Sequence, residues 1–135
     1  MTYLDANIFI YAATDTTTMG DACRKILRKV AKKELDAFTS YLTWDEFVYK
    51  IKKEFGMEAA LDQGEKFLHF FNLTLLKVDD SIISKAQELM EKYNLNPRDA
   101  IHAATALLHN IPSLTSDDAD FDKIVELKRI KPLTS

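Results

Sequence analysis

The sequence predicts an α/β fold of three layers, in which a central, mostly parallel sheet of about four to five strands lies between helices on both faces. Short apolar segments near residues 2–10, 35–40, 73–78 and 113–115 alternate with longer amphipathic segments. This alternation is typical of strand–helix–strand units, whose consecutive strands run parallel. The chain has 135 residues, of which 47% are hydrophobic and 29% charged. These values suit a single domain, residues 1–135, with a substantial core.

Composition excludes several classes of protein. A single cysteine, Cys23, rules out an internal disulfide and fits a reducing cytoplasm. No apolar run reaches the roughly 18 residues that span a bilayer, and no leader precedes the first apolar segment. We therefore expect a cytoplasmic protein with no membrane partner. The net charge of −3 gives no general attraction for nucleic acid, so any such binding requires a local basic patch.

The first apolar segment, residues 2–10, is interrupted by Asp5 and Asn7. Burying an aspartate in such a segment is costly unless a cation or several hydrogen-bond donors satisfy it. We therefore predict a central strand that ends at Asp5 and delivers its carboxylate to a cleft. A helix cap does not explain an acid at the end of a strand, so Asp5 is the strongest single indication of a site.

The remaining elements follow from the spacing of apolar residues. Apolar positions three and four apart predict helices, and short apolar runs predict strands. The segment 57–71 is expected to bury Leu61 and Phe71, and the segment 96–108 is apolar nearly all round, which marks a central helix. The expected helices span residues 21–34, 43–56, 57–71, 79–93 and 96–108, and the further expected strands span 35–40, 73–78, 113–115 and 127–130, the last at an edge.

Four acids map to one edge of the predicted sheet: Asp5, Glu46, Asp99 and Asp118. In parallel sheets, sites form beyond the carboxyl ends of the strands and beside helix N-termini. Each acid also has an ordinary explanation. A capping box with Thr43 explains Glu46, a helix N-terminus explains Asp99, and Asp118 suits a loop. The combination of the four, rather than any single one, indicates a functional site.

The chemistry of such a cluster is that of an oxygen-ligand metal site. Carboxylates without cysteine favour Mg²⁺ or Mn²⁺ over zinc. Divalent ions held in this way can bind a phosphodiester, activate a water molecule and stabilise the leaving oxygen. The sequence contains no Ser/His/Asp arrangement and no glycine-rich phosphate loop.

Four segments of the chain contain these acids and their neighbours: LDANIF (residues 4–9), TSxxTxDE (39–46), NLNPRDAIHAATA (94–106) and SDDADF (116–121). In this order they resemble the motifs of PIN-domain ribonucleases, and especially those of the VapC-type toxins of toxin–antitoxin pairs. The DAIH variant resembles archaeal members. The resemblance spans nearly the whole chain and implies a PIN-like fold and an endoribonuclease that depends on Mg²⁺ or Mn²⁺.

The resemblance also implies roles for individual residues. Asp5, Glu46 and Asp99 match the three core acids of the family. The fourth acid lies in a Thr/Ser-x-Asp-x-Asp-Phe pattern, which gives Asp118 when aligned on Phe121. Alignment on Thr115 gives Asp117 instead and needs one inserted residue. Supporting roles at the rim of the site or in orienting the first acid fall to Asn7, Ser116, Asp117 and Asp120.

Partners are implied in the same way. Family members are commonly homodimers, and toxin members are held inactive by a cognate antitoxin, so we expect both, together with an RNA substrate. Candidate RNA contacts are Arg98, beside Asp99, and the basic helix face of Arg24, Lys25 and Arg28. A solvated helix face is the more common explanation of such a basic stripe, and a surface or salt-bridge arginine explains Arg98 as well as a phosphate contact does. His102 lies one turn after Asp99, and an apolar helix favours a hydrogen-bonded core histidine over a metal ligand.

Two other functions fit parts of the pattern. A phosphatase of the haloacid-dehalogenase type uses a strand-end aspartate as nucleophile but requires a second aspartate two positions on, where this chain has Asn7. A non-catalytic binding module of the same fold would use the acids only as helix caps.

Overall fold

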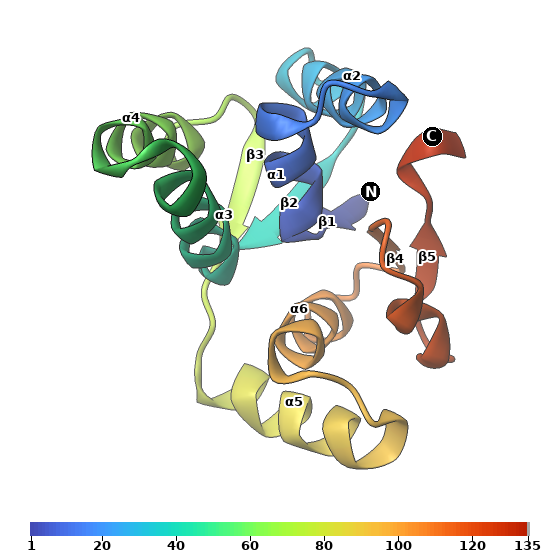
Figure 1. Cartoon of the computed structure of the whole chain (residues 1–135). Helices are drawn as coiled ribbons and strands as arrows, with labels where there is room; N and C mark the ends of the chain where they lie inside the picture. Colours follow the sequence, from blue (N-terminus) through green and yellow to red (C-terminus); the bar gives the residue numbers. More distant parts are fainter. Residues whose placement is uncertain (135) are drawn as a thin grey trace.

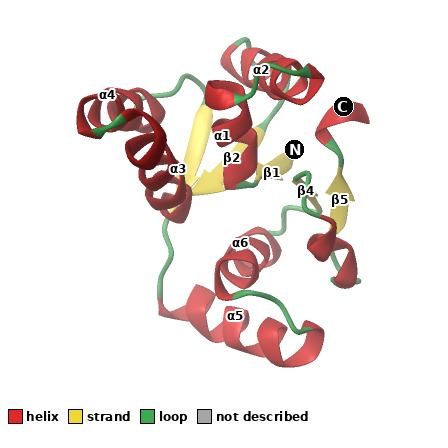
Figure 2. Ribbon diagram, in the orientation of Figure 1, coloured by secondary structure: helices red, strands yellow, loops and turns green. Residues whose placement is uncertain are grey.

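The computed structural model describes residues 1–134 and has three layers, with a parallel sheet between helices on both faces (Figures 1 and 2). The sheet has five strands in the order β3-β2-β1-β4-β5, and every pairing is parallel, as predicted. The strands are β1 (Thr2–Leu4), β2 (Ala37–Ser40), β3 (Leu73–Leu76), β4 (Ser113–Thr115) and β5 (Lys128–Ile130).

The order of the strands places a switch point at the centre of the sheet. The chain builds outward from β1 through β2 to β3, then returns to add β4 and β5 on the other side of β1. In parallel sheets, ligands bind beyond the carboxyl ends of the strands where the order reverses. Asp5 follows β1 directly and Ser116 follows β4 directly, so both lie at this point.

The helices divide between the two faces of the sheet (Figure 1). One face carries the first four helices and the other carries α5, α6 and the short 3₁₀ helix η1, each side with its own apolar core. Successive residues of β1 alternate between them, because strand side chains alternate in direction: Tyr3 packs into one core and Leu4 into the other. The helices are α1 (Ala6–Thr14), α2 (Thr18–Ala31), α3 (Tyr41–Phe55), α4 (Met57–Leu68), α5 (Asp80–Tyr93), α6 (Pro97–Leu108), η1 (Ala119–Lys123) and η2 (Pro132–Thr134).

Residues 6–14, for which the sequence predicted no helix, form helix α1. Asp5 is the N-cap of this helix, and its Oδ1 accepts a hydrogen bond from the backbone N–H of Ala6 at 2.7 Å. The expectation that a helix cap does not explain Asp5 is therefore wrong. The apolar residues of α1 pack against the sheet and α2. A short apolar segment that is buried in this way can form either a helix or a strand, and hydrophobic periodicity alone does not distinguish the two.

Two further corrections concern α3 and α4. Helix α3 begins at Tyr41 rather than Thr43, so Glu46 lies in its second turn and not in a capping box. The hydroxyl of Thr43 is instead buried against that of Thr39, at 2.7 Å. Helix α4 ends at Leu68, and Leu61 and Phe71 are 64% and 76% exposed rather than buried. Within residues 1–134, no helix combines the length and apolar character needed to cross a membrane.

Candidate metal centre at the carboxyl edge of the sheet

The acids predicted from the sequence lie on four different elements around the switch point. Asp5 ends β1, Glu46 is in the second turn of α3, Asp99 is in the first turn of α6, and Asp118 is the N-cap of η1. Glu46, Asp99 and Asp118 line one open hollow of about 600 Å³, together with the helix start at residues 96–98. The fold therefore gathers side chains that are more than a hundred residues apart in sequence.

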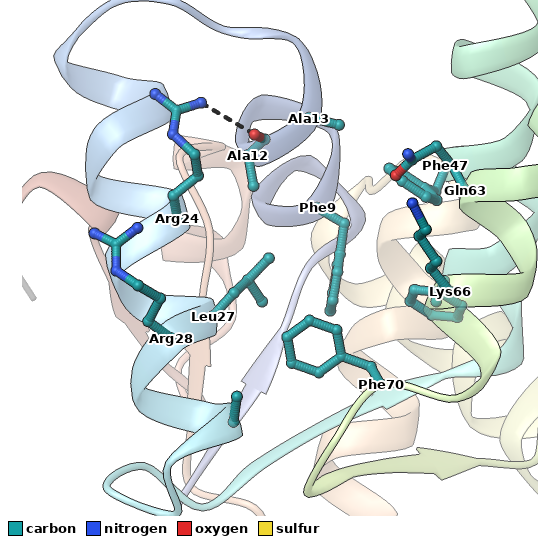
Figure 3. A pocket seen from close by; sticks show the side chains of 12 residues that line it. Phe9, Ala12, Ala13, Arg24, Leu27, Arg28, Phe47, Gln63, Lys66 and Phe70 are labelled. Carbon is teal, nitrogen blue, oxygen red and sulfur yellow. Dashed lines mark hydrogen bonds between the residues drawn. The ribbon is translucent and has the colours of Figure 1, made fainter. Parts of the chain in front are cut away.

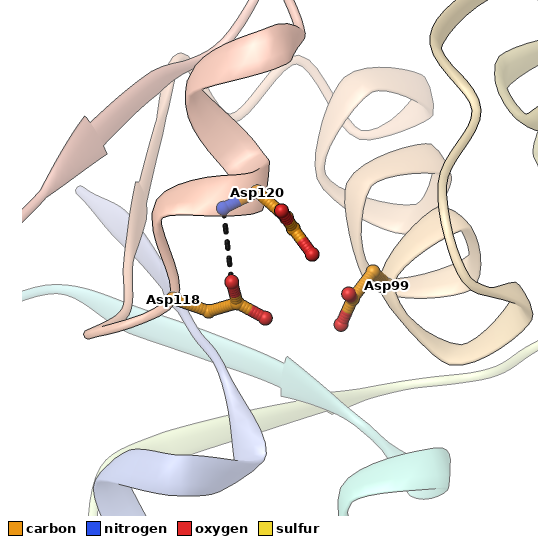
Figure 4. Close-up of side chains that lie close together, drawn as sticks. All are labelled: Asp99, Asp118 and Asp120. Atoms are coloured by element: carbon orange, nitrogen blue, oxygen red, sulfur yellow. Dashed lines mark hydrogen bonds between the residues drawn. The ribbon is translucent and has the colours of Figure 1, made fainter.

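The tightest group of carboxylates is Asp99, Asp118 and Asp120. One oxygen from each lies within 4.8 Å of the others (Figure 4). The N-cap of η1 fixes the loop, because Asp118 Oδ1 accepts a hydrogen bond from the backbone N–H of Asp120 at 2.9 Å. Asp120, expected only at the rim, thus faces Asp99 directly. Asp117 is exposed and outside this group, so the geometry favours Asp118 as the fourth acid.

Asp5 is held in the interior behind this group. Its Oδ2 accepts a hydrogen bond from Ser116 Oγ at 2.6 Å, in addition to the Ala6 bond to Oδ1. Burial raises the pKa of Asp5 above its ordinary value, against the opposing charge of His102 and the hydrogen bond from Ser116. Ionised Asp5 is therefore costly without a cation nearby.

Ser116 connects three residues of the site. It donates to Asp5, and its oxygen accepts from Asn7 Nδ2 at 3.1 Å and from the backbone N–H of Asp118 at 3.0 Å. Because the only hydroxyl hydrogen of Ser116 goes to Asp5, the amide of Asn7 must direct its nitrogen toward Ser116. Asn7 Oδ1 is then buried without a hydrogen-bond partner among residues 1–134. A buried oxygen of this kind calls for a donor or a cation.

Glu46 is fixed from the core side by His102. Glu46 Oε1 lies 2.6 Å from His102 Nε2, and Asp5 Oδ1 lies 3.7 Å from the same nitrogen. His102 is fully buried, as the sequence suggested, and its Nδ1 lies 2.7 Å from the hydroxyl of Tyr3. Burial opposes a charged imidazole, but Tyr3 and the two carboxylates outweigh it and raise the pKa of His102 well above its ordinary value.

The ionisation of Asp99 is also costly in the absence of a cation. Burial, followed by the charges of Asp118 and Asp5, raises the pKa of Asp99 to about 7. Among the described residues 1–134, no hydrogen bond reaches its carboxylate, so it does not act as a cap for α6. Half-buried carboxylates facing one another form a donor set that fits a hard divalent cation such as Mg²⁺ or Mn²⁺. The residues present therefore fit the metal that the sequence predicts.

The candidate RNA contacts fall in two places. Arg98 lines the acidic hollow and is exposed, without an ion pair or hydrogen bond in the part of the chain that the structure describes. Arg24 instead binds the carbonyl oxygens of Ala12 and Asp15. With Arg28 it lines a different hollow of about 380 Å³, which is apolar and contains none of the acids (Figure 3). Lys25 is exposed on the same helix, α2.

Arg129, which was not predicted from the sequence, holds the loop that carries the acids. Its side chain is only 7% exposed, and Nε and Nη2 bind both carboxylate oxygens of Asp122 at 2.9 and 3.0 Å. Its Nη1 donates to the carbonyl oxygen of Ser116 at 3.2 Å. The only signal in the sequence was an arginine within the short edge strand β5, which is not specific.

The chain is similar to known proteins over nearly its whole length. Over 141 aligned residues the chain is 26% identical to Ribonuclease VapC2 of Methanocaldococcus jannaschii, covering 96% of this chain and 92% of the relative. Its fold resembles that in the crystal structure of VapBC2 from Rickettsia felis, bound to a DNA fragment from their promoter, with TM-score 0.74, 23% identity and coverage of 97% and 98%. It also resembles a toxin–antitoxin complex from Klebsiella pneumoniae, with TM-score 0.72, 21% identity and coverage of 98% of both chains. The PIN domain description matches residues 2–127, and this chain therefore belongs to the PIN domain family.

Proposed function

We propose that this protein is a metal-dependent endoribonuclease of the VapC type that hydrolyses phosphodiester bonds in RNA. The observation that carries the proposal is the group formed by Asp99, Asp118 and Asp120, whose carboxylate oxygens lie within 4.8 Å of one another at the switch point of a PIN domain. The similarity to a protein named a ribonuclease supports RNA as the substrate.

In this proposal Asp5, Glu46, Asp99 and Asp118 hold Mg²⁺ or Mn²⁺, and Asp120 completes the group. Bound ions of this kind activate water and stabilise the leaving oxygen of a phosphodiester. The chain's own residues supply the geometry. Ser116 orients Asp5 and, through the backbone, Asp118. Arg98, the cation that lines the hollow, binds a phosphate of the RNA strand.

The partners that we propose are an antitoxin and a second copy of the chain. The Klebsiella neighbour comes from a toxin–antitoxin complex, which supports an antitoxin. The apolar hollow that contains Phe9, Leu27 and Phe70 is a surface that can take apolar side chains of a partner peptide (Figure 3). The exposed apolar residues of α3 and α4, such as Phe55 and Leu61, support an interface between copies. We also propose a cytoplasmic location, which is compatible with an RNA substrate.

The test is cleavage of a panel of labelled single-stranded RNAs after removal of any co-purified partner. We expect cutting with Mn²⁺, none with EDTA, and none with Asp5→Asn, which preserves the shape of the buried side chain. Asp36→Asn, at an exposed acid before β2, is the matched control and should cut normally. Cutting that persists in EDTA, or full activity of Asp5→Asn, would show that the assignment is wrong.

The same samples separate the nuclease from a non-catalytic binding module. A divalent ion that binds only the folded protein raises its melting temperature. No shift at millimolar Mn²⁺, together with no cleavage, would favour the binding module. Membership of the PIN family leaves the haloacid-dehalogenase alternative without support, and no observation favours it.

A further inference from the structure

A chain of buried polar groups runs from the centre of the sheet to the metal site. Ser40, at the end of β2, accepts a hydrogen bond from the hydroxyl of Tyr3 at 2.8 Å, and that hydroxyl lies 2.7 Å from His102 Nδ1. His102 Nε2 then lies 2.6 Å from Glu46 Oε1. Ser40, Tyr3 and His102 are each fully buried, whereas the side chain of Glu46 is 20% exposed.

The direction of the last hydrogen bond is set by chemistry. A carboxylate that binds a metal is ionised and can only accept hydrogen bonds, so His102 Nε2 must carry a hydrogen and donate it. This bond occupies Oε1 of Glu46 and leaves Oε2 for the hollow that Glu46 lines with Asp99 and Asp118. Glu46 has no other hydrogen bond or ion pair within residues 1–134, so His102 alone fixes its carboxylate.

We propose that His102, supported by Tyr3 and Ser40, is a positioning residue that holds the Glu46 carboxylate in its metal-binding orientation. His102 sits on α6 one turn beyond Asp99, while Glu46 comes from α3. The hydrogen bond therefore connects α6, which carries Asp99, to α3, which carries Glu46. This inference rests on the proposed function, since it assigns a role toward the metal of that site. Hydrogen-bond partners behind metal ligands typically contribute 10- to 100-fold in metal affinity.

The experiment measures Mn²⁺ affinity by titration calorimetry on the folded, RNA-free protein, so its readout does not depend on cleavage. His102→Leu removes the donor, and we expect Mn²⁺ to bind about 10- to 100-fold more weakly. His102→Gln keeps an N–H at the position of Nε2 and should restore most of the affinity. Tyr3→Phe removes the support behind Nδ1 and should give a smaller loss. It also provides a second test if His102→Leu does not fold.

Thr105→Val is the matched control. Thr105 is also fully buried on α6, but its hydroxyl bonds only the carbonyl oxygen of Ile101, so its loss should leave Mn²⁺ affinity unchanged. Affinity in folded His102→Leu equal to or tighter than wild type would overturn the inference, as would equal losses in His102→Gln and His102→Leu. Unchanged Mn²⁺ binding in Glu46→Gln would overturn it while leaving the nuclease intact. Failure of wild type to bind Mn²⁺ would overturn the proposed function itself.

Discussion

Replacing Asp99 with asparagine should stabilise the metal-free protein, although it removes a residue of the metal site. Asp99 has a pKa of about 7 in the folded protein, against an ordinary value of 3.8. An acid with a higher pKa in the folded state binds more protons when folded, so the free energy of unfolding falls as the pH rises from about 4 to about 7. Asparagine is neutral throughout and lacks this dependence.

The size of the effect follows from the same values. A pKa of about 7 corresponds to a loss of about 2.6 kcal/mol in the free energy of unfolding between pH 5 and pH 8. Solvent access at the half-buried carboxylate reduces this to about 1–2 kcal/mol. In EDTA, the advantage of Asp99→Asn over wild type in the free energy of unfolding should therefore be about 1–2 kcal/mol greater at pH 8 than at pH 5.

Urea denaturation at the two pH values measures this difference directly. Asp5 and His102 also have raised pKa values, so wild type has a further pH dependence, and the part of it that does not depend on the charge of Asp99 is common to both proteins and cancels. Addition of Mn²⁺ at pH 8 should reverse the order, because only wild type retains the full carboxylate set and gains binding energy. Metal-free Asp99→Asn that is less stable than wild type at pH 8 would refute the reasoning.

Three further predictions follow from the site. Asp118→Asn should lose Mn²⁺ binding and cleavage, whereas Asp117→Asn should retain both; the reverse pattern in calorimetry and RNA cutting would assign the fourth acid to Asp117. Arg129→Met should lower the free energy of unfolding by about 2 kcal/mol, because it removes charge-assisted bonds to Asp122 and the Ser116 carbonyl. Lys128→Met, at an exposed residue of the same strand, should stay within about 0.5 kcal/mol in the same denaturation experiment. Mn²⁺ affinity should rise from pH 6 to pH 8 as Asp99 releases its proton, and equal calorimetric affinities at the two pH values would contradict this.

The fold was largely predictable because its elements have distinct periodicities. Strand β4 has the predicted bounds, and α5 begins after Asp79 as its polar N-cap indicated. Residues 6–14 were not assigned to a helix because α1 is short and apolar on several sides. A buried strand has the same pattern of apolar residues. Leu61 and Phe71 were expected inside, but hydrophobic spacing does not distinguish a core face from an exposed apolar surface.

The candidate site was predictable as a set of acids but not as a geometry. The sequence placed Asp5, Glu46, Asp99 and Asp118 at one edge because parallel topology brings strand ends together. It did not reveal that Asp120 faces Asp99, because this depends on the turn of η1. The hydrogen-bond partners of His102 and Arg129 were not predictable from the sequence either, because these bonds join segments that are distant in sequence.

Strand β5 has a consequence for how the proposed site could be disabled from a distance. The backbone N–H of Ser116 bonds the carbonyl oxygen of Ile130, and Arg129 binds the Ser116 carbonyl, so the loop bearing Asp118 is held by residues of β5. This strand lies at the edge of the sheet, beside β4. A contact that pulled β5 away from β4 would therefore release the loop bearing Asp118 without touching any of the acids.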